Sequence, residues 1–397
     1  MTTLGIVGFV IALLVSVMLH EAGHFLTAKR FGMKVTEFFV GFGPRLWSFR
    51  RGETEYGVKA IPAGGYVRIV GMTPLEDVPE ADRSRAFYRQ PAPQRALVLA
   101  AGSLTHFLIA LVLLTIVTLG LGSPALTPTI STVSACVPTI TATSDVCAPG
   151  ATASPAELAG IRPGDQIVSV DGHPTRSWNQ VTSAIVAAGP GPATVVVERT
   201  GRQITLHPDL VESTRPSLTT PGATVTVPFL GVGPSIVVQR TNPLPLYGQF
   251  FTLSVKGLMA IPVAVPRLFG QAFEHAPRPA NGLTGVVGFA RVTGQVVGAP
   301  DPTYVRVGLF LMLIASLNVF IGIFNLLPLL PLDGGHLAVL VFEQVRRGLY
   351  RIFGRSDPGR VDLRKLMPAT YVVLVLLIGL SVLLLVADIV NPLQLPA

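Results

Sequence analysis

The stretch LGIVGFVIALLVSVMLHEAGHF, residues 4–25, decides the fold class. Residues 4–19 carry no charge, and directly after them Glu21 stands between His20 and His24. With apolar residues 25–28 added, the run reaches the roughly 20 residues that a membrane-spanning helix needs. No basic segment precedes the run and no small-residue cleavage site follows it. It is therefore predicted to be a retained transmembrane helix and not a signal peptide.

The composition also indicates a membrane protein. Of 397 residues, 49% are hydrophobic and only 13% are charged, which exceeds what a soluble core of this size requires. Three further apolar runs, at residues 96–121, 307–332 and 369–386, are predicted to span the membrane. The apolar segment 244–269 carries two basic residues and three prolines, and it is predicted to lie in the outer membrane interface. The fold class is thus a polytopic α-helical membrane protein with four transmembrane helices.

The basic residues are unevenly distributed and predict the orientation. Of the 30 Lys and Arg residues, 12 lie between Lys29 and Arg95 and 7 between Arg346 and Lys365, whereas residues 122–302 hold 10. Basic loops stay in the cytosol, so the middle segment and both termini are predicted to be extracytoplasmic. Aromatic residues do not interleave with the basic ones, so the net charge of +8 does not indicate nucleic-acid binding.

The middle segment contains a compact module, AELAGIRPGDQIVSVDGHPTRSWNQVTSAIVAAGPGPATVVVERTGRQITL, at residues 156–206. Alternating residues predict strands at 166–170 and 193–199, and a helix is predicted at 177–188. The arrangement resembles a PDZ domain, an α+β fold, which implies a groove for an extended peptide or a chain terminus. Cys136 and Cys147 precede the module, and we expect a disulfide between them in an oxidising compartment, the alternative being two unpaired thiols.

The rest of the chain is divided from its patterns. Residues 35–71 alternate aromatic and β-branched residues with polar ones and predict β-hairpins on the cytosolic face, whereas 72–93 and 123–155 are predicted to be a linker and a loop. The predicted division is: first transmembrane helix, 1–33; cytosolic-side β region and linker, 34–93; second helix, 94–122; extracytoplasmic loop and PDZ domain, 123–240; interfacial segment, 241–304; third helix, 305–334; basic cytosolic loop, 335–367; fourth helix, 368–390; extracytoplasmic tail, 391–397.

The HEAGH stretch, residues 20–24, has the HExxH pattern. Residues i and i+4 share a helix face, so both imidazoles can point at one zinc ion while Glu21 takes a proton from a water at the open position. If the helix begins near Leu4, His20 lies about 24 Å along it, within a hydrocarbon layer of about 30 Å. Ionisable groups inside a membrane are costly, so we expect these three residues to be functional.

A third zinc ligand is predicted at Asp333, in FNLLPLLPLDGGH at residues 324–336. This carboxylate lies at the same cytosolic end of the membrane as His20. The prolines break the helix where backbone lines a cavity, and Gly334 and Gly335 permit close approach or a positive φ. The alternative is that Asp333 only caps a turn that ends the helix.

With these motifs together, the chain resembles the site-2 protease family over nearly its whole length. The resemblance is carried by HExxH in the first span, NxxPxxPxDG at residues 325–334, the PDZ-like module, and GFGPRLW with IPAGGYVRIVG at 41–71. It implies an intramembrane zinc metalloendopeptidase of the bacterial inner membrane that cuts single-pass proteins such as anti-sigma factors, after a first extracytoplasmic cut. In this reading Glu21 is the base, one Zn²⁺ is bound by His20, His24 and Asp333, Asn325 binds the substrate backbone or oxyanion, and strand 57–70 with Gly64 and Gly65 pairs with the substrate.

The chain departs from the family pattern in AAGSLTHF, residues 100–107, where members commonly show AGPxxN. His106 in this stretch is interpreted as a histidine with its own partners, the alternative being a metal ligand. Two other functions compete with proteolysis: a zinc transporter, and a non-catalytic scaffold that presents the PDZ domain. Neither needs Glu21 as a base, so Glu21→Gln distinguishes them from a protease.

Overall fold

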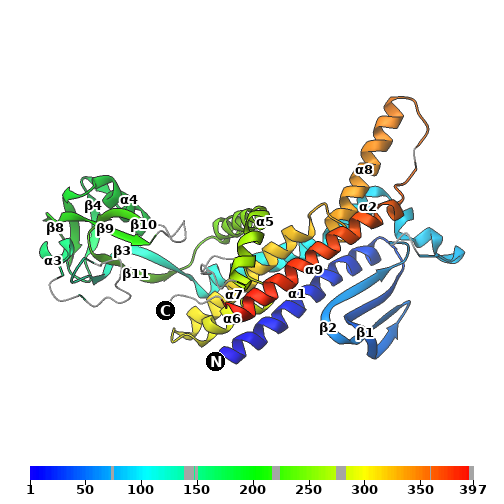
Figure 1. The fold of residues 1–397 in the computed structure, drawn as a ribbon, viewed down its shortest axis with the longest axis horizontal. Helices are drawn as coiled ribbons and strands as arrows, with labels where there is room; N and C mark the ends of the chain where they lie inside the picture. Colours follow the sequence, from blue (N-terminus) through cyan, green and yellow to red (C-terminus); the bar gives the residue numbers. More distant parts are fainter. Residues whose placement is uncertain are drawn as a thin grey trace. The chain divides into compact units, whose positions relative to one another are not determined.

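The computed structural model describes residues 1–72, 76–137, 147, 151–216, 224–273, 283–357 and 359–392. The chain forms two compact units, one of Met1–Leu121 with Thr241–Ala397 and one of Gly122–Arg240. The first unit contains the long helices and a β-hairpin, and the second contains most of the strands (Figure 1).

The first unit is built on five helices that are long and apolar enough to cross a membrane. Within this unit α2 packs against α1, α7 and α5, and the long helices lie side by side (Figure 1). The five are α1 (Thr2–Arg30), α2 (Ala92–Thr115, continued by a π-helical turn at Ile116–Leu121), α5 (Pro243–Phe273), α7 (Thr303–Asn325) and α9 (Met367–Val390).

The predicted number of four transmembrane helices is not confirmed, because α5 is the fifth candidate span. The basic residues and prolines of this segment predict a position in the membrane interface. In the structure Pro262 and Pro266 lie inside one continuous helix. Its residues pack against α2, α7 and α9, and buried Leu268 and Ala272 form a cluster with Leu383 of α9. Neighbouring helices thus accommodate the prolines.

The segment after the third predicted span is also more regular than expected. The helix ends at Asn325, and Asp333 begins a new amphipathic helix, α8 (Asp333–Ile352), in what was predicted to be a basic loop. Three short 3₁₀ helices occupy the predicted linker and the rest of that loop: η1 (Glu80–Arg85), η2 (Phe87–Arg89) and η4 (Leu363–Leu366).

A shorter helix, α6 (Val286–Gly298), is held between α1 and α9. It approaches α1 closely, because a Cβ on Gly5 would lie 2.9 Å from the Cα of Gly294. At its other side, the fully buried carboxylate of Asp388 accepts hydrogen bonds from the N–H groups of Gly285 (3.0 Å) and Gly288 (2.7 Å). Asp388 thus caps α6 from α9, a role that the sequence does not reveal.

We expect Asp388→Ala to destabilise the helical unit by about 2–4 kcal/mol. The change leaves two N–H groups at the N-terminus of α6 without their acceptor in a buried position. Asp388→Asn keeps one acceptor oxygen and should recover part of the loss. Thermal unfolding of the purified protein in one detergent measures both variants. Equal stability of Asp388→Ala and the wild-type protein would contradict the capping role.

The hairpin consists of β1 (Val35–Arg51) and β2 (Thr54–Ile69), which pair twice. Residues 37–40 of β1 lie between two segments of β2, 55–58 on one side and 65–68 on the other, while residues 45–51 pair with 54–59. Consequently only the second half of β2 forms an edge beside β1. The predicted edge strand 57–70 is therefore shorter than expected, because its first residues are enclosed by β1.

Charged side chains fasten the hairpin to the end of α1. Glu53 accepts hydrogen bonds from Lys29 (2.7 Å) and from Arg85 (2.6 and 2.8 Å). The hydrogen bonds from Arg85, together with Lys29, lower the pKa of Glu53 from 4.5 to about 2. This carboxylate therefore stabilises the folded state above about pH 4.5, and the contribution is lost as the pH falls from there through about 2.

The second unit contains two sheets around one hydrophobic core, with buried Ile167, Val181 and Val195 among its members. One sheet has the order β11-β3-β4-β7-β8 with β5 on β4, and the other has the order β10-β9-β6. The elements are β3 (Ser123–Val133), α3 (Pro155–Leu158), β4 (Gln166–Val170), β5 (His173–Pro174), α4 (Trp178–Ala188), β6 (Gly191–Pro192), β7 (Val195–Arg199), β8 (Arg202–Leu206), β9 (Asp209–Pro216), β10 (Thr224–Phe229) and β11 (Val232–Gln239).

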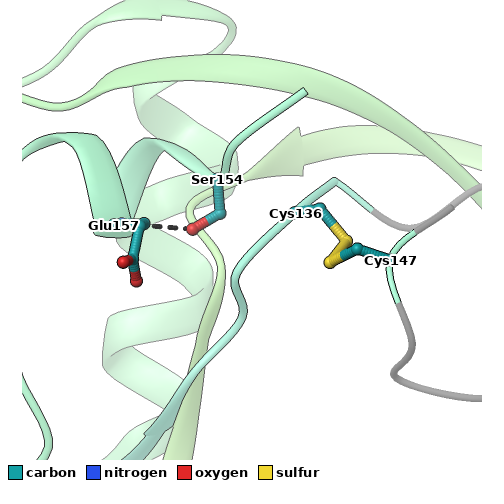
Figure 2. The surroundings of a disulfide bond; sticks show 4 residues. All are labelled: Cys136, Cys147, Ser154 and Glu157. Carbon is teal, nitrogen blue, oxygen red and sulfur yellow. Dashed lines mark hydrogen bonds between the residues drawn. A yellow bond between two sulfur atoms is a disulfide. The ribbon is translucent and has the colours of Figure 1, made fainter. Parts of the chain in front are cut away.

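The strands and helix predicted at 166–170, 177–188 and 193–199 agree with β4, α4 and β7 to within two residues. The predicted loop 123–155 instead begins with β3, which forms because β11, about 100 residues later, pairs with it. After β3, Cys136 and Cys147 are joined by a disulfide, with their Cα atoms 5.9 Å apart (Figure 2). The assignment of this unit as a PDZ domain stays a prediction.

Candidate metal centre

Three predicted ligands meet although Asp333 is more than 300 residues away from the histidines in the sequence. His20 and His24 lie one turn apart on α1, and Asp333 is the first residue of α8. The Nε2 atoms of His20 and His24 are 3.2 Å apart, and Oδ2 of Asp333 lies 3.3 and 3.2 Å from them. These side chains form a group that could hold a metal ion. Both imidazoles are buried, with 8% and 4% of their residue surfaces exposed.

The spacing of the three atoms fits zinc. Tetrahedral zinc bonded at about 2.0–2.2 Å holds its ligand atoms about 3.3–3.6 Å apart. Nδ1 of His24 lies 2.7 Å from the carbonyl oxygen of Val98, so it donates its proton there and leaves the Nε2 lone pair facing Asp333. Within the described residues, buried Oδ2 of Asp333 has no hydrogen-bond donor. Electron-pair donors therefore converge on one point, which a cation would stabilise.

Glycines allow α1 and α2 to approach around the two imidazoles. A Cβ on Gly23 would lie 2.8 Å from the carbonyl oxygen of Ala101, so the backbones of the two helices are in contact there. A Cβ on Gly102 would lie 2.4 Å from Cε1 of His20 and 2.5 Å from Nε2 of His24. Only glycine at position 102 leaves space for both rings in their observed positions.

We expect Gly102→Ala to weaken zinc binding by about tenfold or more, because the added methyl group must displace at least one ligand imidazole. Gly379→Ala, in α9, is the matched control, since its Cβ would meet no described atom within 4 Å. Zinc affinity of both purified variants can be measured by competition with a chelator. If Gly102→Ala binds zinc as tightly as the control, the rings do not occupy these positions.

Glu21 lies beside the ligands and close to the edge of the hairpin. It follows His20 on α1 and is half-buried. A Cβ on Gly65 of β2 would lie 3.4 Å from Cγ of Glu21 and 2.7 Å from the sulfur of Met18. Gly65 therefore lets the edge of β2 lie against this part of α1, and its neighbour Gly64 has a φ of +128°, which favours glycine.

The connection from α7 to α8 is tightly folded and sets the position of Asp333. A Cβ on Gly334 would lie 2.2 Å from the carbonyl carbon of Leu326, and one on Gly335 would lie 2.5 Å from the backbone nitrogen of Leu330. Glycine is needed at these two positions because the backbone of residues 326–330 lies so close, and neither glycine has a positive φ. Asn325 is the half-buried last residue of α7, and its side chain makes no hydrogen bond with the described residues.

The buried amide of Asn318 lies beside the metal centre and was not predicted from the sequence. Nδ1 of His106 is 2.8 Å from Oδ1 of Asn318, and Nδ2 of Asn318 donates to Oγ of Ser16 at 3.1 Å. The interpretation of His106 as a histidine with its own partner agrees with this contact. Asn318 lies in an apolar run with no motif around it, and only its polarity within that run could have indicated a role.

Two histidines one helical turn apart, an adjacent glutamate and a third carboxylate, on helices apolar enough to cross a membrane, constitute the chemistry of a membrane metallopeptidase. The comparison with protein families agrees, since the family described as peptidase family M50 matches residues 8–353. The chain belongs to this family, that of the site-2 proteases, and is a zinc metalloprotease with several membrane-spanning helices.

Three relatives match most of the chain. Zinc metalloprotease Rip1 of Mycobacterium tuberculosis is 39% identical over an alignment 413 positions long, which covers 98% of both chains. Rip1 of Mycolicibacterium smegmatis is 38% identical over 411, again with 98% of both covered. Metalloprotease MmpA of Caulobacter vibrioides is 29% identical over 377, which cover 85% of this chain and 86% of the relative.

Proposed function

We propose that this protein is an intramembrane endopeptidase that hydrolyses peptide bonds within the transmembrane segments of single-pass proteins. The depth of the metal centre supports the proposal most directly. His20 is 18 residues beyond Thr2, the first residue of α1, and so lies about 27 Å along the helix. In a hydrocarbon layer of about 30 Å, this distance along the helix supports a centre below the membrane surface.

In this proposal His20, His24 and Asp333 hold the zinc, and Glu21 is the general base. Bound zinc supplies a Lewis acid and lowers the pKa of a bound water. Glu21 takes the proton of the attacking water and then delivers it to the leaving amine nitrogen. Burial of both imidazoles and the hydrogen bond from His24 to Val98 keep the ligands oriented for each turnover.

The substrate is proposed to bind as an added strand on the edge of β2. A transmembrane helix hides its carbonyl groups in its own hydrogen bonds, so it must be unwound before hydrolysis. Residues 65–69 form the outer segment of the hairpin, and Gly65 lies against Glu21. A substrate strand paired with this edge would pass the base in extended form. Asn325 is proposed to contact the substrate backbone or the oxyanion, with Gly64 and Gly65 leaving space for the strand.

The proposed substrates are anti-sigma factors and similar single-pass proteins of the bacterial inner membrane. The asymmetry of Lys and Arg supports an orientation with the metal centre near the cytosolic side and the second unit outside. A PDZ-type groove in that unit would bind a peptide or a chain terminus and exclude substrates with an intact extracytoplasmic domain. A first cut outside would therefore precede the intramembrane cut.

The order of cuts can be tested in proteoliposomes. Wild-type enzyme is mixed with a single-pass anti-sigma factor, either intact or shortened to a short extracytoplasmic stub. We expect the shortened form to be cleaved and the intact form to resist. The enzyme stays intact in this test, because only the extracytoplasmic domain of the substrate is changed. Equal cleavage of both forms would contradict the requirement for a first cut, and cleavage of neither would contradict the proposed substrate class.

A further inference from the structure

We propose that His106 and Asn318 are positioning residues for the zinc ligand His20, and that Ser16 connects them to α1. They act by fixing the imidazole of His20 and are not ligands themselves. This inference rests on the proposed function, because it assigns a supporting structure to the metal centre described there.

The two ligand histidines are held in different ways. His24 donates its second ring nitrogen to the carbonyl oxygen of Val98 at 2.7 Å. Nδ1 of His20 is buried and has no hydrogen-bond partner in the part of the chain that the structure describes. A ligating histidine normally fixes its ring through such a bond. The orientation of the His20 ring must therefore depend on the side chains that pack against it.

Two positions on one face of α2 pack against His20. Gly102 allows the ring to approach the helix, since a Cβ there would lie 2.4 Å from Cε1 of His20. His106 follows four residues later, one turn along the same face. Its ring centroid lies 5.0 Å from that of His20, with an angle of 42° between the planes. His106 thus limits how far the His20 ring can tilt away from the metal centre.

Asn318 fixes His106 in turn. Its Nδ2 donates to the carbonyl oxygen of Ile314 at 2.8 Å and to Oγ of Ser16 at 3.1 Å. Because both amide protons are used, Oδ1 is the acceptor that faces Nδ1 of His106 at 2.8 Å. His106, Asn318 and Ser16 are buried, with 1%, 0% and 3% of their surfaces exposed. In such an apolar setting the amide cannot turn without losing several hydrogen bonds.

The chain of contacts links three helices around one ligand. Ser16 precedes His20 by one turn of α1, Asn318 lies on α7, and His106 lies on α2. Zinc binding depends on Nε2 of His20 staying at its 3.2–3.3 Å separation from the other two ligand atoms. A His106 ring that is free to rotate would let His20 tilt. The metal would then bind less tightly even though all three ligands are present.

Zinc affinity of the purified full-length protein tests the proposal, measured by chelator competition together with kcat and KM on a shortened single-pass substrate. We expect Asn318→Leu and His106→Ala to lower zinc affinity by about 10–100-fold. His106→Phe keeps an aromatic ring against His20 and should recover most of the affinity. Ser316→Ala is the control, because the one hydrogen bond of its hydroxyl among the described residues is donated to the carbonyl oxygen of Leu313 within α7. With zinc in excess, the affected variants should regain kcat with little change in KM.

Three results would overturn the proposal. Wild-type zinc affinity in folded Asn318→Leu and His106→Ala would show that the cluster does not position His20. Lower thermal stability of the zinc-free variants without a change in zinc affinity would show a purely structural role. Loss of zinc by His106→Phe as severe as that by Asp333→Asn would show that His106 is a ligand. Each of these leaves the proposed function intact if the wild-type protein binds zinc and cleaves.

Discussion

Glu21→Gln is expected to lower the rate of peptide cleavage by about 10²–10⁴-fold while zinc stays bound. Glutamine matches glutamate in size but cannot accept the proton of the attacking water. The three proposed ligand atoms belong to His20, His24 and Asp333, so the change leaves the proposed ligand set complete. The measurement pairs zinc content with cleavage of a single-pass substrate, both on the same preparation.

A matched control separates the base from general effects of charge removal. Glu80→Gln neutralises an exposed carboxylate whose partner is Arg83, and both zinc content and cleavage should be unchanged. If Glu21→Gln cleaves at the rate of this control, Glu21 is not the base. A zinc transporter or a non-catalytic scaffold would then account better for the metal centre.

Asp333→Asn is expected to abolish zinc binding and cleavage together. A neutral amide oxygen is a poorer zinc ligand than a carboxylate, and its introduction removes the negative charge that faces two imidazoles at 3.2–3.3 Å. The competing explanation is that Asp333 only starts α8, in whose first turn it lies. Under that explanation asparagine should be nearly harmless, because Asn is, like Asp, a favoured turn residue.

Asp362→Asn is the control for the capping explanation. Asp362 is the N-cap of η4 and accepts a hydrogen bond from the N–H of Arg364 at 3.0 Å. This variant should keep its zinc and its activity. Wild-type zinc content with wild-type cleavage in Asp333→Asn would remove Asp333 from the site and make His106 the next candidate for the third ligand. The two active-site variants thus differ in a diagnostic way: Glu21→Gln retains zinc, whereas Asp333→Asn loses it.

Much of the metal centre could be predicted from the sequence, because its chemistry is local. The spacing of His20 and His24 places both on one helix face whatever the helix packs against. Asp333 could be predicted because a carboxylate among prolines and glycines is unusual at the end of an apolar run. Their convergence to 3.2–3.3 Å could not be predicted, since it depends on how α8 folds back towards α1.

The parts that could not be predicted depend on contacts between distant segments. β1 has no local signal that it will pair with both halves of β2, so the edge strand was expected to be longer. Asp388 caps a helix about 100 residues earlier, and β3 pairs with a strand about 100 residues later. The need for glycine at position 102 arises only when two imidazoles from another helix lie against it. In each case tertiary packing decides what a local pattern leaves open.

Hydrolysis is proposed to take place within the membrane at this metal centre, and mapping the cleavage site tests this proposal. A shortened single-pass substrate is reconstituted with the enzyme in liposomes, and the fragments are identified by mass spectrometry. Wild-type enzyme is expected to produce new termini inside the apolar transmembrane segment. These should disappear with a zinc chelator, return when zinc is added, and be absent with Glu21→Gln. New termini only in the polar flanks of the substrate, or the same intramembrane termini with Glu21→Gln, would contradict the proposal.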